Sequence, residues 1–224
     1  MSLLSDPNIF NELFLARRQN LQLLIDATDA SSGSRIGGRA PECFAQSPMS
    51  CPCCSRAMVY YLTLAPDLFG SAIESGQAIS VFYCPDFSCR LRSRRLQEPP
   101  SLVAIGHADC ARGDSDNVSD SPIEGRRIVA GQIVGDVNEY GERDQSSKIG
   151  GRPGLIQRSG ATDVERLETE RLEFIFQFNE ESYPADMKYG KYPFAFGAVY
   201  VFGRVSVDRP VIDATMTAAF WQST

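Results

Sequence analysis

Five of the seven cysteines fall in two short clusters, and their spacing is the feature of the sequence with the clearest chemical meaning. The first cluster reads C-x2-C across a CPCC turn, and the second reads C-x4-C at the end of an apolar run. Zinc prefers four soft ligands in a tetrahedron, and two turns that each offer two thiolates can supply them without leaving an open position. We therefore predict one structural zinc ion bound by Cys51, Cys54, Cys84 and Cys89.

Other ligand sets stay open at this point. Cys53 could replace a neighbouring cysteine, and His107 with Cys110 forms an H-x2-C pair that could also supply ligands. The cysteines could instead be reduced, buried side chains that pack as small hydrophobes. Catalysis by the His107–Cys110 pair is disfavoured, because residues three apart in an extended segment seldom face each other and no orienting third group is evident.

An arginine tract, RLRSRR, follows the second cysteine cluster directly. In an extended segment alternate side chains share one face, so three of these arginines would project together and could contact an acidic partner. A later segment, SYPADMKYGKYPFAFG, is rich in aromatic residues. Tyrosine and arginine often dominate protein interfaces. We predict that both segments form parts of one partner-binding surface, with Arg90, Arg92, Arg94, Tyr183, Tyr189 and Tyr192 as its main residues.

Short strands and one helix must position these residues. At the N-terminus, Asp6 can cap a helix in which apolar residues recur at helical spacing up to Ile25. Segments 58–64 and 79–83 are rich in β-branched and aromatic residues, which favours a strand next to each cysteine cluster. Segment 126–137 predicts a further strand.

Nearly the same phrase occurs twice, as SRIGGRAP from Ser34 and as SKIGGRP from Ser147. The runs that follow also correspond, YYLTLAPDLF with FIFQFNEESY and ISVFYC with AVYVFG. Their common order and near-constant offset indicate an internal duplication, in which each glycine pair marks a tight turn. The predicted fold is α+β, with two similar β-rich halves packed together. Its parts are an N-terminal helix in residues 1–33, a first half with the zinc site in 34–125, and a second half without cysteines in 126–224.

The bulk composition is that of a globular protein, with 43% hydrophobic and 22% charged residues. A formal net charge of −6 disfavours binding to nucleic acid or to anionic membranes, because such binding depends on a positive field. The sequence shows neither an apolar run of about 18 residues nor an N-terminal targeting signal. We therefore expect a cytoplasmic protein with a protein partner, without nucleic-acid or membrane binding.

Three motifs together resemble a known family. The KIGGRPGLIQ phrase, the CPCC turn followed by a strand, and the later FYC…C ending are similar to the YwqG-like family of uncharacterised bacterial proteins. They are more distantly similar to programmed cell death protein 2 and its yeast relative. The eukaryotic resemblance implies a chaperone for a ribosomal protein, and the bacterial one implies an immunity-type binder. The sequence departs from the eukaryotic pattern in having one cysteine set, with Gly203 where the first half has Cys84.

The function that follows is a non-catalytic protein-binding module with a structural zinc site, either an immunity-type or a chaperone-like binder. The alternative is an enzyme of unrecognised type that acts in a pocket between the halves. A closed pocket gathering Asp, Glu or His107 side chains would favour the enzyme, whereas exposed aromatic residues along a groove would favour the binder.

Overall fold

Runs of β-branched and aromatic residues form most of the regular structure. The computed structural model describes residues 7–28, 32–44, 49–74, 76–92, 100–108, 121–137, 142–187, 192–206 and 211–224. Its strands are β1 (Gln19–Ile25), β2 (Arg35–Ile36), β3 (Val59–Leu64), β4 (Gln77–Tyr83), β5 (Leu102–Ala108), β6 (Arg126–Gly135), β7 (Lys148–Ile149), β8 (Glu173–Asn179), β9 (Ala198–Ser206) and β10 (Val211–Gln222). The α-helices are α1 (Pro7–Phe10), α2 (Pro66–Phe69), α3 (Phe87–Arg92) and α4 (Gly160–Thr169). A π-helical turn, η2 (Asn11–Leu15), continues α1, and the 3-10 turns are η3 (Glu42–Phe44), η4 (Gly70–Ala72), η5 (Glu180–Ser182) and η6 (Ala185–Met187).

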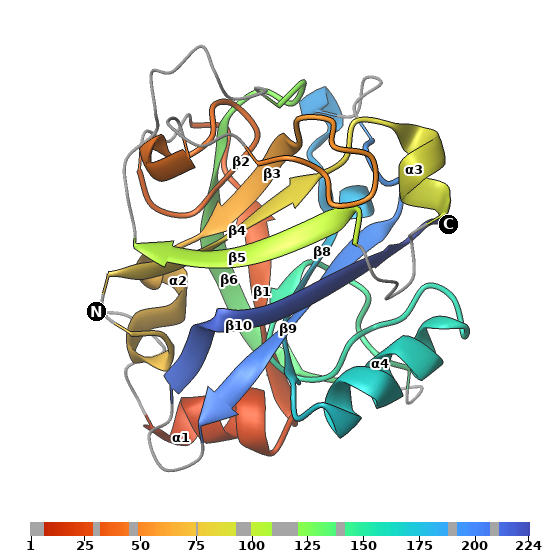
Figure 1. Ribbon diagram of the computed structural model, residues 1–224. Coiled ribbons are helices and arrows are strands. Elements are labelled where there is room, and N and C mark those ends of the chain that lie inside the picture. Colours follow the sequence, from red (N-terminus) through yellow and green to blue (C-terminus); the bar gives the residue numbers. More distant parts are fainter. Residues whose placement is uncertain are drawn as a thin grey trace.

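All of these strands belong to one antiparallel sheet, in the order β10-β9-β8-β7-β1-β6-β2-β3-β4-β5. The strands at its two ends, β5 and β10, lie side by side across the front of the molecule (Figure 1). The Thr217 hydroxyl donates to the Ala104 carbonyl at 2.7 Å. Gly106 lies so close to the Ala214 carbonyl that there is no room for a Cβ atom. The sheet is therefore nearly closed and barrel-like.

The interior of this barrel is an aromatic core. Tyr61, Phe194 and Trp221 are almost fully buried, and the Phe194 ring lies 5.0 Å from the Tyr61 ring and 5.6 Å from the Trp221 ring, between centroids. Because strand side chains alternate, the same strands also bury residues on their other face, in two smaller clusters. The cysteine-side cluster comprises Ala40, Phe44, Cys51, Met58, Tyr60, Phe82, Cys84 and Cys89. The helix-side cluster comprises Val164, Leu167, Leu172, Phe174, Ala198, Tyr200, Phe202 and Phe220.

The predicted fold class is wrong. The chain is mostly β, and its α-helices are short, with α4 the longest in the described residues at 10 residues. The prediction of two similar β-rich halves packed together is wrong as well, because the strands form one continuous sheet. In that sheet β1, from the N-terminal segment, lies between β7 and β6. The residue boundaries 1–33, 34–125 and 126–224 stay a prediction.

The predicted N-terminal helix ends much earlier than expected. Helical turns stop at Leu15, the chain turns at Arg17 with a φ of 54°, and residues 19–25 form β1. In β1, Leu21 and Leu23 are buried whereas Leu24 is 52% exposed, which is strand alternation rather than a helical stripe. Pairing with β6 and β7 satisfies the backbone of this segment, so the tertiary context overrides the apparent helical period.

Three of the predicted strands and both predicted glycine turns are confirmed. The expected strands near 58–64, 79–83 and 126–137 correspond to β3, β4 and β6. Both glycine pairs adopt positive φ angles, 69° and 68° at Gly37 and Gly38 and 74° and 68° at Gly150 and Gly151. Residues other than glycine rarely adopt positive φ angles, which explains why both phrases carry glycine there. Each pair therefore makes a tight turn, next to β2 and to β7 respectively.

None of the described helices is both long enough and apolar enough to cross a membrane.

Candidate metal centre

The structure brings the four predicted cysteines together. The Sγ atoms of four residues all lie within 4.8 Å of one another, those of Cys51, Cys54, Cys84 and Cys89. The Cys51 and Cys89 sulfurs are 3.8 Å apart, and those of Cys54 and Cys84 are 3.5 Å apart. A disulfide would need roughly 2.05 Å, whereas four thiolates around a metal at about 2.3 Å lie roughly 3.8 Å from one another. All four cysteines are free thiols with the spacing of metal ligands, and they can bind a metal ion.

The first pair of cysteines lies in a tight turn before β3. The Cys51 N–H donates to the Arg56 carbonyl at 2.7 Å, and the Ser55 N–H donates to the Cys51 carbonyl at 2.8 Å. Ser55 has a φ of 59°, in the left-handed region, which lets the chain reverse within one turn. The turn therefore fixes the backbone on both sides of Cys54.

The second pair is held by the end of β4 and the start of α3. The Cys84 N–H donates to the Ser101 carbonyl at 2.9 Å, which anchors the residue directly after the strand. The Cys89 N–H donates to the Asp86 carboxylate at 3.2 Å, so Asp86 caps the first turn of α3. Asp86 was not among the predicted site residues, although an aspartate just before a helix is a recognisable capping signal.

Burial sets the protonation of these thiols. Cys51, Cys84 and Cys89 are 1%, 0% and 2% exposed. Burial raises the pKa of Cys84 to about 12 and raises the pKa of Cys89 as well. The pKa of Cys54 is lowered, chiefly because the Arg56 backbone N–H donates to its sulfur. Buried thiolates need a compensating cation, so metal binding at this group releases protons.

The alternative ligands do not join this group. Cys53 is exposed, and it is not one of the four clustered residues. His107 Nε2 lies 2.7 Å from the Ser80 hydroxyl, and Nδ1 lies 2.7 Å from the Ala108 carbonyl oxygen, so both ring nitrogens are engaged elsewhere. Cys110 lies outside the described residues.

The predicted arginine surface begins inside the protein rather than on it. Residues 87–92 are helical, so the expected extended arrangement is wrong there. Arg90 is 6% exposed, donates to the Cys84 carbonyl, and lies over the Tyr83 and Phe87 rings at 5.2 and 5.3 Å. It therefore braces the second cysteine turn. Arg94 and the side chain of Arg92 lie outside the described residues.

The predicted tyrosines form a stack that runs outward from the core. Tyr183 is 2% exposed, and its hydroxyl lies 2.9 Å from the Tyr61 hydroxyl. Tyr192 is half-buried and stacks on Tyr183 with an interplanar angle of 11° and 5.8 Å between ring centroids. Tyr189 lies outside the described residues. Phe196, which sequence reasoning missed, ends the stack 4.0 Å from the Tyr192 ring and is 50% exposed.

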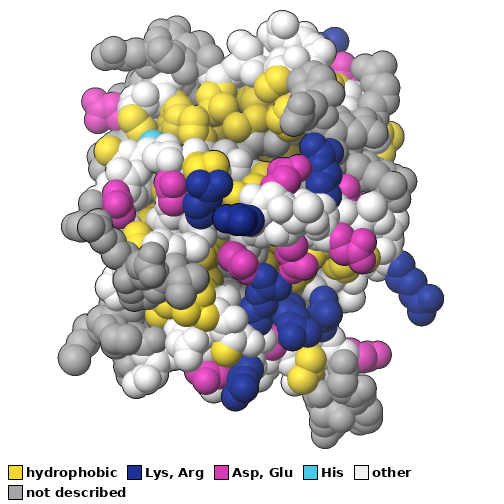
Figure 2. Space-filling view, turned by 60° about the horizontal axis from the view of Figure 1, so that its bottom comes forward, with side chains coloured by type: hydrophobic (Ala, Val, Ile, Leu, Met, Phe, Trp, Pro, Cys, Tyr) yellow, Lys and Arg dark blue, Asp and Glu magenta, His cyan; other side chains and the backbone are white. Residues whose placement is uncertain are grey.

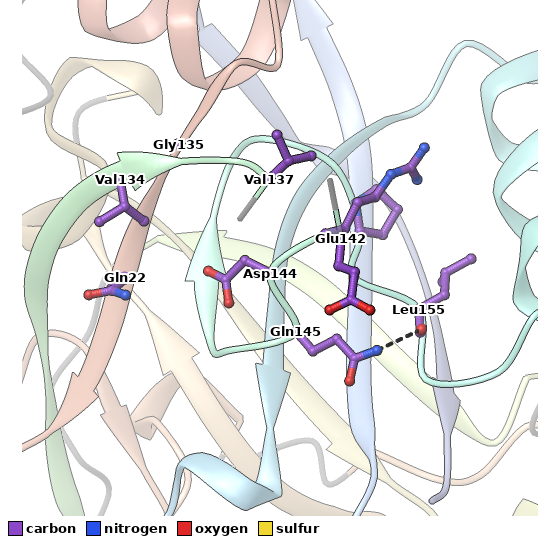
Figure 3. Close-up of a pocket in the computed structure, with 11 residues that line it drawn as sticks. Gln22, Val134, Gly135, Val137, Glu142, Asp144, Gln145 and Leu155 are labelled. Atoms are coloured by element: carbon purple, nitrogen blue, oxygen red, sulfur yellow. Dashed lines mark hydrogen bonds between the residues drawn. The ribbon is translucent and has the colours of Figure 1, made fainter. Parts of the chain in front are cut away.

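A polar pocket of about 810 Å³ lies beside β1 and β6 (Figure 3). Figure 3 shows Glu142, Asp144 and Gln145 opposite Gln22 and Val134, and Gln145 donates to the Leu155 carbonyl at 3.1 Å. The Asp144 carboxylate accepts from the Ser146 N–H and hydroxyl at 2.9 and 2.7 Å, so it is engaged in its own turn. His107 does not line this pocket. The enzyme alternative stays a prediction.

Comparison with known proteins does not identify a family for this chain. No protein-family model matches the chain, and no curated protein matches it. The resemblance to YwqG-like proteins therefore stays a prediction.

Proposed function

We propose that this chain is a non-catalytic protein-binding module whose four-cysteine group holds a structural zinc ion. The observation that carries the zinc assignment is the set of four buried or half-buried thiols at metal-ligand spacing. Thiolate sulfur is a soft ligand that suits zinc, and four protein ligands complete its tetrahedron. A site filled by the protein leaves no position for a substrate, so the ion acts on stability.

The ion would join two segments that the pairing of β3 with β4 brings side by side. Cys51 and Cys54 belong to the turn before β3, and Cys84 and Cys89 belong to the end of β4 and to α3. Zinc supplies the positive charge that keeps their sulfurs deprotonated in a buried place. The turn at Ser55 and the cap at Asp86 position the backbone around the four sulfurs.

The aromatic stack of Tyr183, Tyr192 and Phe196 supports the assignment to protein binding. Ala195 and Phe196 have φ angles of 53° and 59°, in the left-handed region that residues other than glycine rarely adopt. Such backbone strain is often kept at functional sites. Here it accompanies a half-exposed Phe196 ring that rests on a partly buried Tyr192, so a rigid apolar ring faces solvent. Anchors of this kind fill apolar pockets on partner proteins.

The Tyr183–Tyr192–Phe196 stack fits an immunity-type or chaperone-like binder, because both classes act by contact with another protein. The test begins with affinity purification from the native host and identification of the recovered protein by mass spectrometry. The affinity of that purified protein is then measured for the wild type, for Phe196→Ala and for Leu24→Ala. Leu24 is the matched control, because it is 52% exposed and lies on β1.

We expect Phe196→Ala to weaken binding by at least about tenfold, since truncation of an anchor costs about 2 kcal/mol, and Leu24→Ala to leave it unchanged. Equal affinity of the folded Phe196→Ala variant and the wild type would reject this surface. If no protein is recovered by the wild type, while the pocket beside β1 turns over a small molecule, the enzyme alternative replaces the proposal.

A further inference from the structure

A second group of charged side chains lies far along the chain from the cysteines, at a pocket of about 380 Å³. One wall carries Arg143 and Arg152, and α4 forms the opposite wall. Pro153, Leu155 and Val164 give the pocket apolar surface. The face that Figure 2 brings forward likewise shows dark-blue Lys and Arg side chains gathered next to magenta Asp and Glu side chains. A volume of this size suits a small organic molecule.

The two arginines on this wall carry charge that the described residues do not neutralise. Arg17 also lines the pocket, but it forms ion pairs with Glu168 at 2.7 Å and with Glu173. Arg143 and Arg152 are exposed and form no ion pair with any described residue. In a chain of net charge −6, this pocket brings two such arginines together.

The backbone of both arginines is held next to Asp136, whose carboxylate forms a buried ion pair. Lys148 has no exposed surface, and its ammonium lies 3.0 Å from the Asp136 carboxylate. The same carboxylate oxygen accepts from the Arg152 N–H at 2.9 Å. Arg143 pairs with Val137, the residue after Asp136, in an isolated β-bridge. The backbone positions of the two arginines are therefore fixed relative to each other.

The chemistry of the walls restricts the ligand. Guanidinium groups bind carboxylate and phosphate oxygens through two parallel hydrogen bonds. The apolar residues beside them would cover a short hydrocarbon part. Glu165 and Glu168 on α4 would repel a second anionic group at the far side. The pocket thus matches a molecule with one anionic head and an apolar body.

We propose that this pocket binds a small organic anion, with its carboxylate or phosphate group held by Arg143 and Arg152 and its hydrocarbon part against Pro153, Leu155 and Val164. This site is independent of the four-cysteine group and of the Tyr183–Tyr192–Phe196 stack. Binding there can fail or succeed whatever the outcome for zinc or for a protein partner.

Isothermal titration calorimetry with three probes tests the proposal. Hexanoate and hexyl phosphate carry the two candidate head groups, and 1-hexanol has the same chain without charge. The variants are Arg143→Gln, Arg152→Gln, the double variant, and the control Arg158→Gln. Arg158 is an exposed arginine near α4 that does not line the pocket.

The wild type should bind at least one of the two anions at one site per chain, with 1-hexanol at least about tenfold weaker. The tighter of the two anions identifies the head group. Each single substitution should weaken that anion roughly tenfold, because charge-assisted hydrogen bonds are the strong ones, and the double variant should bind it still more weakly. Arg158→Gln should match the wild type. The proposal is overturned if neither anion binds saturably, if 1-hexanol binds equally well, or if the folded double variant keeps wild-type affinity.

Discussion

The cysteine-side and helix-side clusters bury the same kind of surface by different means. Over β8, β9 and β10, helix α4 places Val164 and Leu167 against aromatic residues such as Tyr200 and Phe220. Over β3 and β4, the described part of the covering segment between Ala40 and Met58 contains short turns and isolated bridges but no α-helix. That segment contributes Phe44 and the first two cysteines instead of a helical face.

The difference shows what replaces a helix when the covering segment is irregular. In α4 the backbone hydrogen bonds are internal, so an apolar stripe is presented without further support. The described part of the segment before β3 has a few turn hydrogen bonds instead of such a ladder. A metal ion bound by the four-cysteine group would join the covering turn to β4 and α3. We therefore expect the cysteine-side cluster to depend on a metal ion and the helix-side cluster to depend on packing alone.

The largest effect should come from Cys84→Ser. Cys84 is fully buried in the four-cysteine group, so its loss removes both a ligand and the metal. We expect the free energy of unfolding to fall by roughly 4 kcal/mol or more, as for other losses of a structural metal. Urea unfolding measures this, and a chelator should destabilise the wild type by a similar amount. The exposed neighbour Cys53 provides the control, since Cys53→Ser should change stability by less than about 0.5 kcal/mol.

The next effect belongs to the helix-side cluster. Leu167 is 0% exposed on α4, and Leu167→Ala should lower the free energy of unfolding by about 3 kcal/mol through lost burial and a cavity. The metal content should stay that of the wild type. Thr162→Ala, at an exposed position of the same helix, is the control. A loss of metal in the folded Leu167→Ala variant would mean that the two clusters are not independent.

Hydrogen exchange should show where metal removal acts. The Cys51 and Cys84 amides are bonded to the Arg56 and Ser101 carbonyls, and a chelator should speed their exchange by at least about tenfold. The Leu172 amide, bonded to Leu167 beneath the helix-side cluster, should exchange as before. Uniform acceleration across both regions would contradict a local role for the metal.

The smallest predicted effect lies in the main core, outside both clusters. Glu180 is fully buried, and burial raises its pKa to about 7 although the Phe194 and Gly197 N–H groups donate to its carboxylate. A raised pKa means that the native state favours the protonated acid, so this contribution to stability is full below the ordinary pKa and is lost as pH rises through 7. Between pH 6 and pH 8 the stability should fall by about 1 kcal/mol.

The substitution Glu180→Gln should remove this pH-dependent part. Urea unfolding of the metal-loaded protein at several pH values measures the slope, and the acid range in which thiolates lose the metal is avoided. Glu181→Gln, at the exposed neighbouring position, should keep the wild-type slope. An unchanged slope in Glu180→Gln would show that another group titrates.

The grouping of the four cysteines could be predicted from the sequence because the information is local. A C-x2-C turn and a C-x4-C turn, each beside an apolar strand, bring four sulfurs together once β3 and β4 pair as neighbours. The N-terminal helix could not be predicted correctly, since residues 19–25 acquire their strand partners β6 and β7 from more than 100 positions away. Their apolar spacing fits both periods, and only the sheet decides between them.

The remaining features depend on contacts between distant segments. The sequence suggests that Arg90 is a surface charge. In the fold, helix α3 places its guanidinium over the Tyr83 and Phe87 rings, where it donates to the second cysteine turn. The sequence did not single out Arg143 or Arg152 as site residues, although Arg152 belongs to the SKIGGRP phrase, because their pocket with α4 exists only in the folded chain. In the sequence Phe196 is one of many aromatic residues. Only the fold shows that its ring stacks on Tyr192 and is half exposed.

The zinc content of Cys54→Ser beside that of Cys53→Ser tests the central claim most directly. The two residues are neighbours in one turn, but only Cys54 belongs to the four-cysteine group. Each protein is purified without added metal, and zinc per chain is measured by inductively coupled plasma mass spectrometry. We predict close to one equivalent of zinc in the wild type and in Cys53→Ser, and well under half an equivalent in Cys54→Ser. The account would be contradicted by a wild-type protein that contains no zinc, or by a Cys54→Ser variant that keeps a full equivalent of zinc.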